Sequence, residues 1–168
     1  IGMITTNTQP EAYYARALYQ KNPVKTQILW VYVVAPQNVV VRKDARIAKL
    51  SDLNGKKFNA GIKGSSTEQT THAVLKALKI TPDYVPGSTG DIVTAVKDNR
   101  VIGYVKSGAG LALDASSRDI ATLTPIDLIS LDANQAAIIG KEFPDLVVID
   151  VPAHVAAKGI GAYKTWGF

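Results

Sequence analysis

Three times along this chain, a short β-rich run ends in a glycine turn that leads into a helical pattern. The turns lie at residues 61–67, 87–91 and 107–110. Strands that alternate with helices predict an α/β fold with a largely parallel sheet. Ligands of open α/β sheets bind beyond the carboxyl ends of the strands, so the three turns are expected to share one edge and to form a small-anion site there.

The first turn carries the most local information. Gly61 and Gly64 allow a tight turn and close approach of a ligand to the backbone. Ser65 and Glu68 have capping-box spacing, which predicts that a helix begins at Ser65. A helix start offers free N–H groups, and the hydroxyls of residues 65–67 add to a cradle for a carboxylate or phosphate. The alternative interpretation is an ordinary capped helix after a strand.

Periodicity places the remaining elements. Strands are expected at 28–34, 38–42, 57–60, 84–85, 101–105, 120–125, 146–151 and 163–168. Helices are expected at 11–19, 65–79, 92–99, 107–117 and 132–141.

Composition argues against several classes of function. The chain has no cysteine, which excludes thiol catalysis and thiolate metal sites, and no cofactor is expected. The net charge is +5, but the lysines are scattered, which does not favour nucleic-acid binding. His72 falls in the central helix and His154 in a loop, neither within a catalytic motif. Enzymatic function therefore has no positive support.

The start of the chain and its longest apolar run indicate whether the chain was processed and whether it could span a membrane. The longest apolar run, residues 28–35, is too short for a spanning helix. The chain begins Ile-Gly-Met rather than with an initiator methionine. We therefore expect a mature, truncated or proteolysed chain. The missing signal peptide is then no evidence against secretion.

The motifs resemble a known family in collinear order. Residues 51–68, SDLNGKKFNAGIKGSSTE, are similar to the Asp-Leu-x-Gly-Lys…Gly-Ser-Gly-Thr stretch of TAXI-type receptors, the solute-binding proteins of tripartite ATP-independent periplasmic (TRAP) transporters. Further similar segments lie at 1–7, 39–44, 92–105 and 121–127. Ser66 stands where the family has the middle glycine of Gly-Ser-Gly-Thr, and Asn99-Arg100 and Gly103 also depart from the family pattern. These departures affect the expected identity of the ligand more than the expected fold.

The resemblance implies a periplasmic-binding-protein type II-like α/β fold, with one complete lobe and part of the other. Residues 1–43 would be a remnant of lobe 1 and the first hinge strand. Residues 44–160 would form lobe 2, and 161–168 would begin the return hinge strand. The chain would then be a fragment that carries one wall of the ligand cleft.

The resemblance also implies an extracytoplasmic, periplasmic receptor without catalysis. It would capture a small carboxylate such as glutamate or 2-oxoglutarate and deliver it to TRAP membrane subunits. The implied ligand-binding residues are Thr6, Asn7, Ser65, Ser66, Thr67, Gly87, Ser88, Tyr104, Ser107 and Gly108. Tyr104 is equally suited to the core, and Lys63 is a candidate for a second carboxylate or simply an exposed lysine.

Two other interpretations stay open. An effector-binding domain of a transcription regulator uses the same two-lobed fold, and a helix-turn-helix encoded upstream would favour it. An enzyme on a similar scaffold would need a nucleophile or metal site.

Overall fold

The computed structural model describes residues 8–16, 19–27 and 33–168. The helices are α1 (Thr8–Tyr13), α2 (Ser66–Ala77), α3 (Thr89–Lys97), α4 (Ala115–Leu123) and α5 (Ala133–Glu142), with 3-10 turns at Lys43–Ala45 and Leu50–Leu53. The strands are β1 (Pro36–Arg42), β2 (Lys57–Asn59), β3 (Asp83–Tyr84), β4 (Gly103–Ser107), β5 (Ile126–Leu128), β6 (Val147–Val151) and β7 (Tyr163–Gly167). None of the helices in these ranges is long and apolar enough to cross a membrane.

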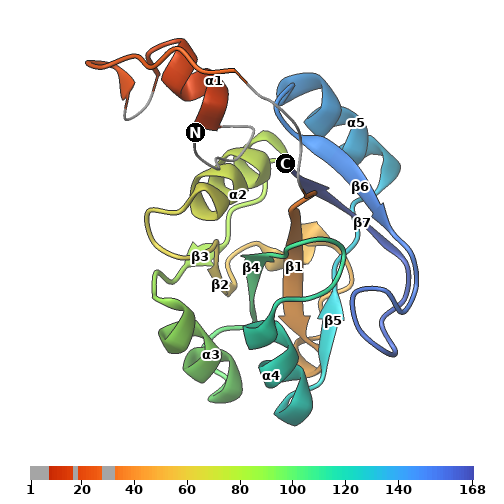
Figure 1. Cartoon of the computed structure of the whole chain (residues 1–168). Helices are drawn as coiled ribbons and strands as arrows, with labels where there is room; N and C mark the ends of the chain where they lie inside the picture. Colours follow the sequence, from red (N-terminus) through yellow and green to blue (C-terminus); the bar gives the residue numbers. More distant parts are fainter. Residues whose placement is uncertain (1–7, 17–18, 28–32) are drawn as a thin grey trace.

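The strands form one mixed sheet in the order β3-β2-β4-β1-β7-β6, with β5 paired to β1 (Figure 1). Strand β2 runs parallel to β3 and β4, as expected for the segments before the glycine turns. Strand β1 is antiparallel to β4, β5 and β7, and β7 is antiparallel to β6. The α/β class is confirmed, but the parallel arrangement is limited to β2, β3 and β4.

Two predicted elements around the third turn are wrong. Residues 108–114 form a loop, and α4 begins at Ala115 because the Asp114 carboxylate accepts hydrogen bonds from the N–H groups of Ser116 and Ser117. The strand expected at 120–125 is the second half of this helix, where Ile120 is buried. The strand expected at 28–34 lies mostly outside the described residues.

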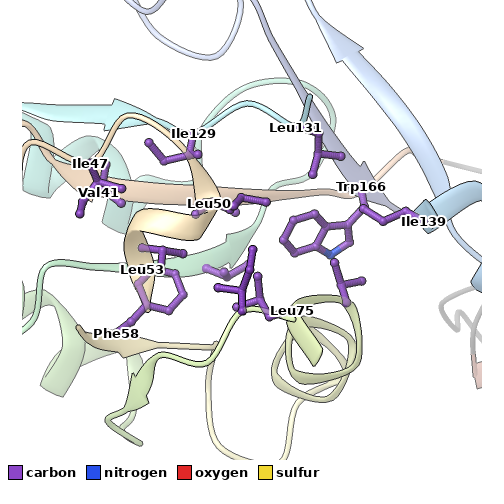
Figure 2. Close-up of a cluster of buried hydrophobic side chains, with 14 of the residues drawn as sticks. Val41, Ile47, Leu50, Leu53, Phe58, Leu75, Ile129, Leu131, Ile139 and Trp166 are labelled. Atoms are coloured by element: carbon purple, nitrogen blue, oxygen red, sulfur yellow. The ribbon is translucent and has the colours of Figure 1, made fainter. Parts of the chain in front are cut away.

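Helices cover both faces of the sheet and divide the core in two. One apolar cluster joins Val39, Val41 and Val105 to side chains of α2 and α5, with Trp166 at its centre (Figure 2). The second cluster joins Val40 and Tyr104 to α3 and α4, which lie side by side in Figure 1. Successive residues of β1 therefore face opposite layers, as the period of a strand requires.

Strand β1 lies between these layers, and each of its residues is buried. Its close neighbour is Gly103, opposite Val41 in β4. A Cβ atom at Gly103 would collide with the Val40 carbonyl oxygen and approach the Val41 Cα to 2.9 Å. The pairing of β1 with β4 therefore requires glycine at this position.

We expect Gly103→Ala to lower the free energy of unfolding by about 3 kcal/mol, because backbone atoms of β1 must move to admit a methyl group. Gly140→Ala is the matched control, since nothing lies within 4 Å of a Cβ at that helical site. The control is expected to raise stability by about 0.5–1 kcal/mol. Urea denaturation measures both, and equal effects would contradict the close approach of β1 and β4.

Candidate functional site

The carboxyl ends of β2, β3 and β4 meet at one edge of the sheet. Phe58 is in register with both Tyr84 and Gly103, and Asn59 with Tyr104. Because the three strands are parallel, the turns that follow them leave from the same edge. The structure thus brings together the three glycine turns, as the sequence predicts.

The first turn holds the start of α2. The Ser65 Oγ accepts from the Glu68 N–H at 3.1 Å, which confirms Ser65 as the N-cap. The Glu68 carboxylate accepts from the Gly64 N–H at 2.6 Å rather than from Ser65, so only half of the capping box forms. Gly61 has φ +131°, and a Cβ there would lie 2.9 Å from the Glu68 nitrogen. Glycine is therefore needed for the turn to pack against the helix.

Two N–H groups are left over at this helix start. Among the described residues, no acceptor lies within hydrogen-bonding range of the backbone N–H of Ser66 or Thr67. Both residues are half-buried, at the edge where β2 ends. Unpaired N–H groups and the positive end of the helix dipole favour an anion here.

In the second turn, side chains cap the start of α3. Ser88 caps α3, and its Oγ donates to the Asp91 carboxylate at 2.7 Å while the Ser88 N–H donates at 2.9 Å. The bonds from this hydroxyl and N–H hold the pKa of the Asp91 carboxyl below its usual value. A Cβ at Gly87 would lie 3.1 Å from Ile92. Ser88 therefore has a structural role that accounts for its presence.

The third turn is tied to the start of β1. The Gly108 N–H donates to the Pro36 carbonyl at 3.0 Å, and a Cβ at Gly108 would lie 2.8 Å from the Ala112 oxygen. Ser107 is paired with Gln37 across the strands and is half-buried. The turn lies at the common edge, but the Gly108 N–H is already occupied.

Two buried tyrosines lie beneath this edge. Tyr104 is 3% exposed, and its hydroxyl donates to the Ser117 Oγ at 2.8 Å. Tyr163 is 6% exposed and donates to the Asn38 Oδ1 at 2.7 Å. Burial raises the pKa of both hydroxyls, that of Tyr163 to about 12. Of the two roles considered for Tyr104, the structure places it in the core, with its ring below a shallow depression.

Sequence reasoning missed the depression between α3, α4 and the end of β4. Its polar lining is Asn59, Thr89, Lys106 and Ser116, and its apolar lining includes Ile62 and Ile120. The cavity volume is about 10 Å³, which is room for one water molecule. The Lys106 Nζ donates to the Thr89 Oγ1 at 2.8 Å. Strand alternation at Tyr104 could have placed Lys106 on this face.

The remaining candidates are Thr6, Asn7 and Lys63. Thr6 and Asn7 lie outside the described residues. Lys63 is exposed in the first turn. In the part of the chain that the structure describes, no three histidine, aspartate or glutamate side chains gather into a metal-binding group.

The mixed sheet, with parallel strands that end at an edge of glycine turns and helices on both faces, is one lobe of the periplasmic-binding-protein type II fold. The chain belongs to the NMT1-like family, whose sequence profile matches residues 1–163.

The chain is similar to parts of several solved structures. An ancestral arginine-binding protein bound to arginine shares 20% identity at a TM-score of 0.45, over 74% of this chain and 57% of that chain. The substrate-binding protein of a polar amino acid ABC uptake transporter from Streptococcus thermophilus shares 14% identity at a TM-score of 0.45, over 92% of this chain and 48% of that chain. The chain thus spans about half the length of these proteins. A comparison with curated protein sequences finds no match.

We expect the two serines at the start of α2 to differ in their effect on stability. Ser65→Ala removes the cap of the helix and should lower the free energy of unfolding by about 1 kcal/mol. Ser66→Ala removes a hydroxyl that caps nothing and should change it by less than about 0.5 kcal/mol. Urea denaturation of both variants measures the difference, and equal losses would contradict the assignment of Ser65 as the N-cap.

Alkaline pH should destabilise the protein through its buried tyrosines. Folded Tyr163 keeps its proton up to a pKa of about 12, whereas an unfolded tyrosine loses it near pH 10. The folded state therefore binds more protons in this window, so stability is full below about pH 10 and falls as the pH rises towards 12.

Tyr163→Phe should reduce this fall, as measured by urea denaturation at stepped pH. Tyr14→Phe is the control, because Tyr14 is 63% exposed. The same pH dependence in Tyr163→Phe as in the unaltered protein would contradict the prediction.

Proposed function

We propose that this chain is part of an extracytoplasmic solute-binding protein that captures a small carboxylate, of the glutamate or 2-oxoglutarate type, for a membrane importer. Its sequence motifs resemble the TAXI receptors, so the proposed partners are the membrane subunits of a TRAP transporter. The proposed place of action is the periplasm or its equivalent outside the cytoplasmic membrane.

The observation that carries the proposal is the pair of N–H groups at Ser66 and Thr67. They lie at the edge where three parallel strands end, and no acceptor from the described residues pairs with them. A carboxylate oxygen is an acceptor that a helix start binds well. The exposed rim at Ile62 and Lys63 leaves room for the rest of the solute.

The two ends of the lobe support a hinge at this same edge. Pro36 at the start of β1 pairs with Gly167 at the end of β7. The Ala35 N–H also donates to the Phe168 carbonyl at 3.1 Å. The chain thus enters and leaves the lobe side by side, as two hinge strands would. We propose that residues 1–43 and 161–168, whose strands β1 and β7 belong to this sheet, continue into a second lobe, and that residues 44–160 form this wall of the cleft.

The proposal contains no catalytic step. His72 packs edge-on against Tyr84, with ring centroids 4.1 Å apart. His154 accepts from the Gly159 N–H at 3.4 Å through its Nδ1. Both histidines have structural contacts and need no role in a reaction.

A proline at Ser66 tests the site directly. Ser66 is the first helical residue, where proline is tolerated, and Ser65 has the extended backbone (φ −79°, ψ 159°) that a following proline requires. Ser66→Pro removes the N–H without removing the helix. We expect binding of glutamate or 2-oxoglutarate to weaken by about tenfold, the effect of one lost charge-assisted hydrogen bond.

Ala133→Pro is the matched control, because it places proline at the same position of α5 after Asp132 (φ −80°, ψ 171°). Isothermal titration calorimetry with each dicarboxylate, and with a neutral amino acid as a further control, measures affinity, and thermal melting checks the fold. Unchanged affinity in a folded Ser66→Pro protein would exclude the first turn as the anchor.

A further inference from the structure

Lys106 sits where the proposed solute would lie. It is the second-last residue of β4, whose neighbour β2 ends in the first glycine turn. Ile62 of that turn and Lys106 both line the depression, so the depression adjoins the beginning of the turn. The lysine is half-buried, and its ammonium group is held by the Thr89 Oγ1 at the start of α3.

Among the described residues, no carboxylate forms an ion pair with Lys106. The ion pairs among the described residues join Arg42, Lys97, Arg100 and Lys164 each to an aspartate. Lys106 has only a neutral hydroxyl as its partner in that part of the chain. A half-buried ammonium group gains most from an anion, because the partly excluded solvent screens the pair less.

The acidic side chains at the starts of α3 and α4 are hydrogen-bonded within their own helix starts. Asp91 accepts from Ser88, and Asp114 accepts from the N–H and hydroxyl groups of Ser116 and Ser117. Each carboxylate is therefore used in capping. The Asp114 charge disfavours an anion at the α4 side of the depression, which leaves the Lys106 and Thr89 side as the favourable one.

We propose that Lys106 binds a second anionic group of the solute and makes this edge select a dicarboxylate over its neutral analogue. This inference rests on the proposed function. In it, the N–H groups of Ser66 and Thr67 hold one carboxylate, and Lys106 with Thr89 holds the other. The methylene groups between them lie against Ile62. Because the cavity holds about one water molecule, only the end of the solute enters it.

The test compares glutamate with glutamine, which differ in one carboxylate and one amide. Calorimetric titration of the 168-residue chain gives both affinities for the unaltered protein and for Lys106→Met, which keeps the length of the side chain without its charge. The unaltered protein should prefer glutamate by about tenfold, and Lys106→Met should bind the two about equally.

Two further lysine variants sharpen the test. Lys63→Met removes the exposed charge in the first turn, and Lys141→Met removes a charge in the last turn of α5. Both should keep the preference for glutamate. Thr89→Val, which removes the partner of Lys106, should reduce the preference without abolishing it. Thermal melting confirms that each variant is folded.

The outcomes separate this inference from the proposed function. If the unaltered chain binds neither amino acid nor 2-oxoglutarate, both are overturned. If glutamate binds and Lys106→Met keeps the preference, or loses affinity for both amino acids equally, the role of Lys106 is overturned while the proposed function stands. Loss of the preference in Lys63→Met instead would assign the second carboxylate to Lys63 and also overturn the inference.

Discussion

The fully buried strand β1 is the constraint on which the rest of the lobe depends. It is hydrogen-bonded to β4, β5 and β7, and its valines form part of both apolar clusters. Its last residue, Arg42, is also buried and is satisfied by the Val96 carbonyl at 2.7 Å and by Asp44. A buried guanidinium needs such partners, and the Val96 carbonyl connects the far end of β1 to α3.

The same strand determines where the candidate site can lie. Because β1 is antiparallel to β4, its first residue, Pro36, lies beside the end of β4 and accepts from Gly108. The third glycine turn is thereby closed against the strand that enters the lobe. The N–H groups of Ser66 and Thr67 have no acceptor among the described residues, because they belong to the first turn of α2. One edge thus carries both the proposed hinge and the proposed anion site.

Local sequence patterns predicted the parts of the fold that depend on nearby residues. The cap at Ser65, the helix after Asp132 and the common edge of the three turns all follow from short-range spacing and strand order. The direction of β1 depends on pairing across the chain, for which periodicity carries no signal. The start of α4 was missed because Asp114 caps it beyond the glycine turn, and an apolar helix face around Ile120 reads as a strand.

The sequence predicted the common edge of the three turns better than the contacts of their polar groups. Ser88 and Gly108 match the glycine and hydroxyl pattern, but their polar groups are used in capping and in backbone pairing. Lys106 carries no motif, and its place beside Thr89 depends on strand alternation and on the packing of α3. Residues that act through tertiary contacts cannot be separated from capping residues by spacing alone.

The most direct test of the central claim is a backbone amide NMR titration of this chain with glutamate. The account predicts that the largest downfield proton shifts belong to the Ser66 and Thr67 amides, because a carboxylate becomes their hydrogen-bond acceptor. The amide of Gly108, which already donates to Pro36, should move far less. Saturable shifts confined to another surface, with Ser66 and Thr67 unmoved, would contradict the claim that this sheet edge is the solute-binding wall.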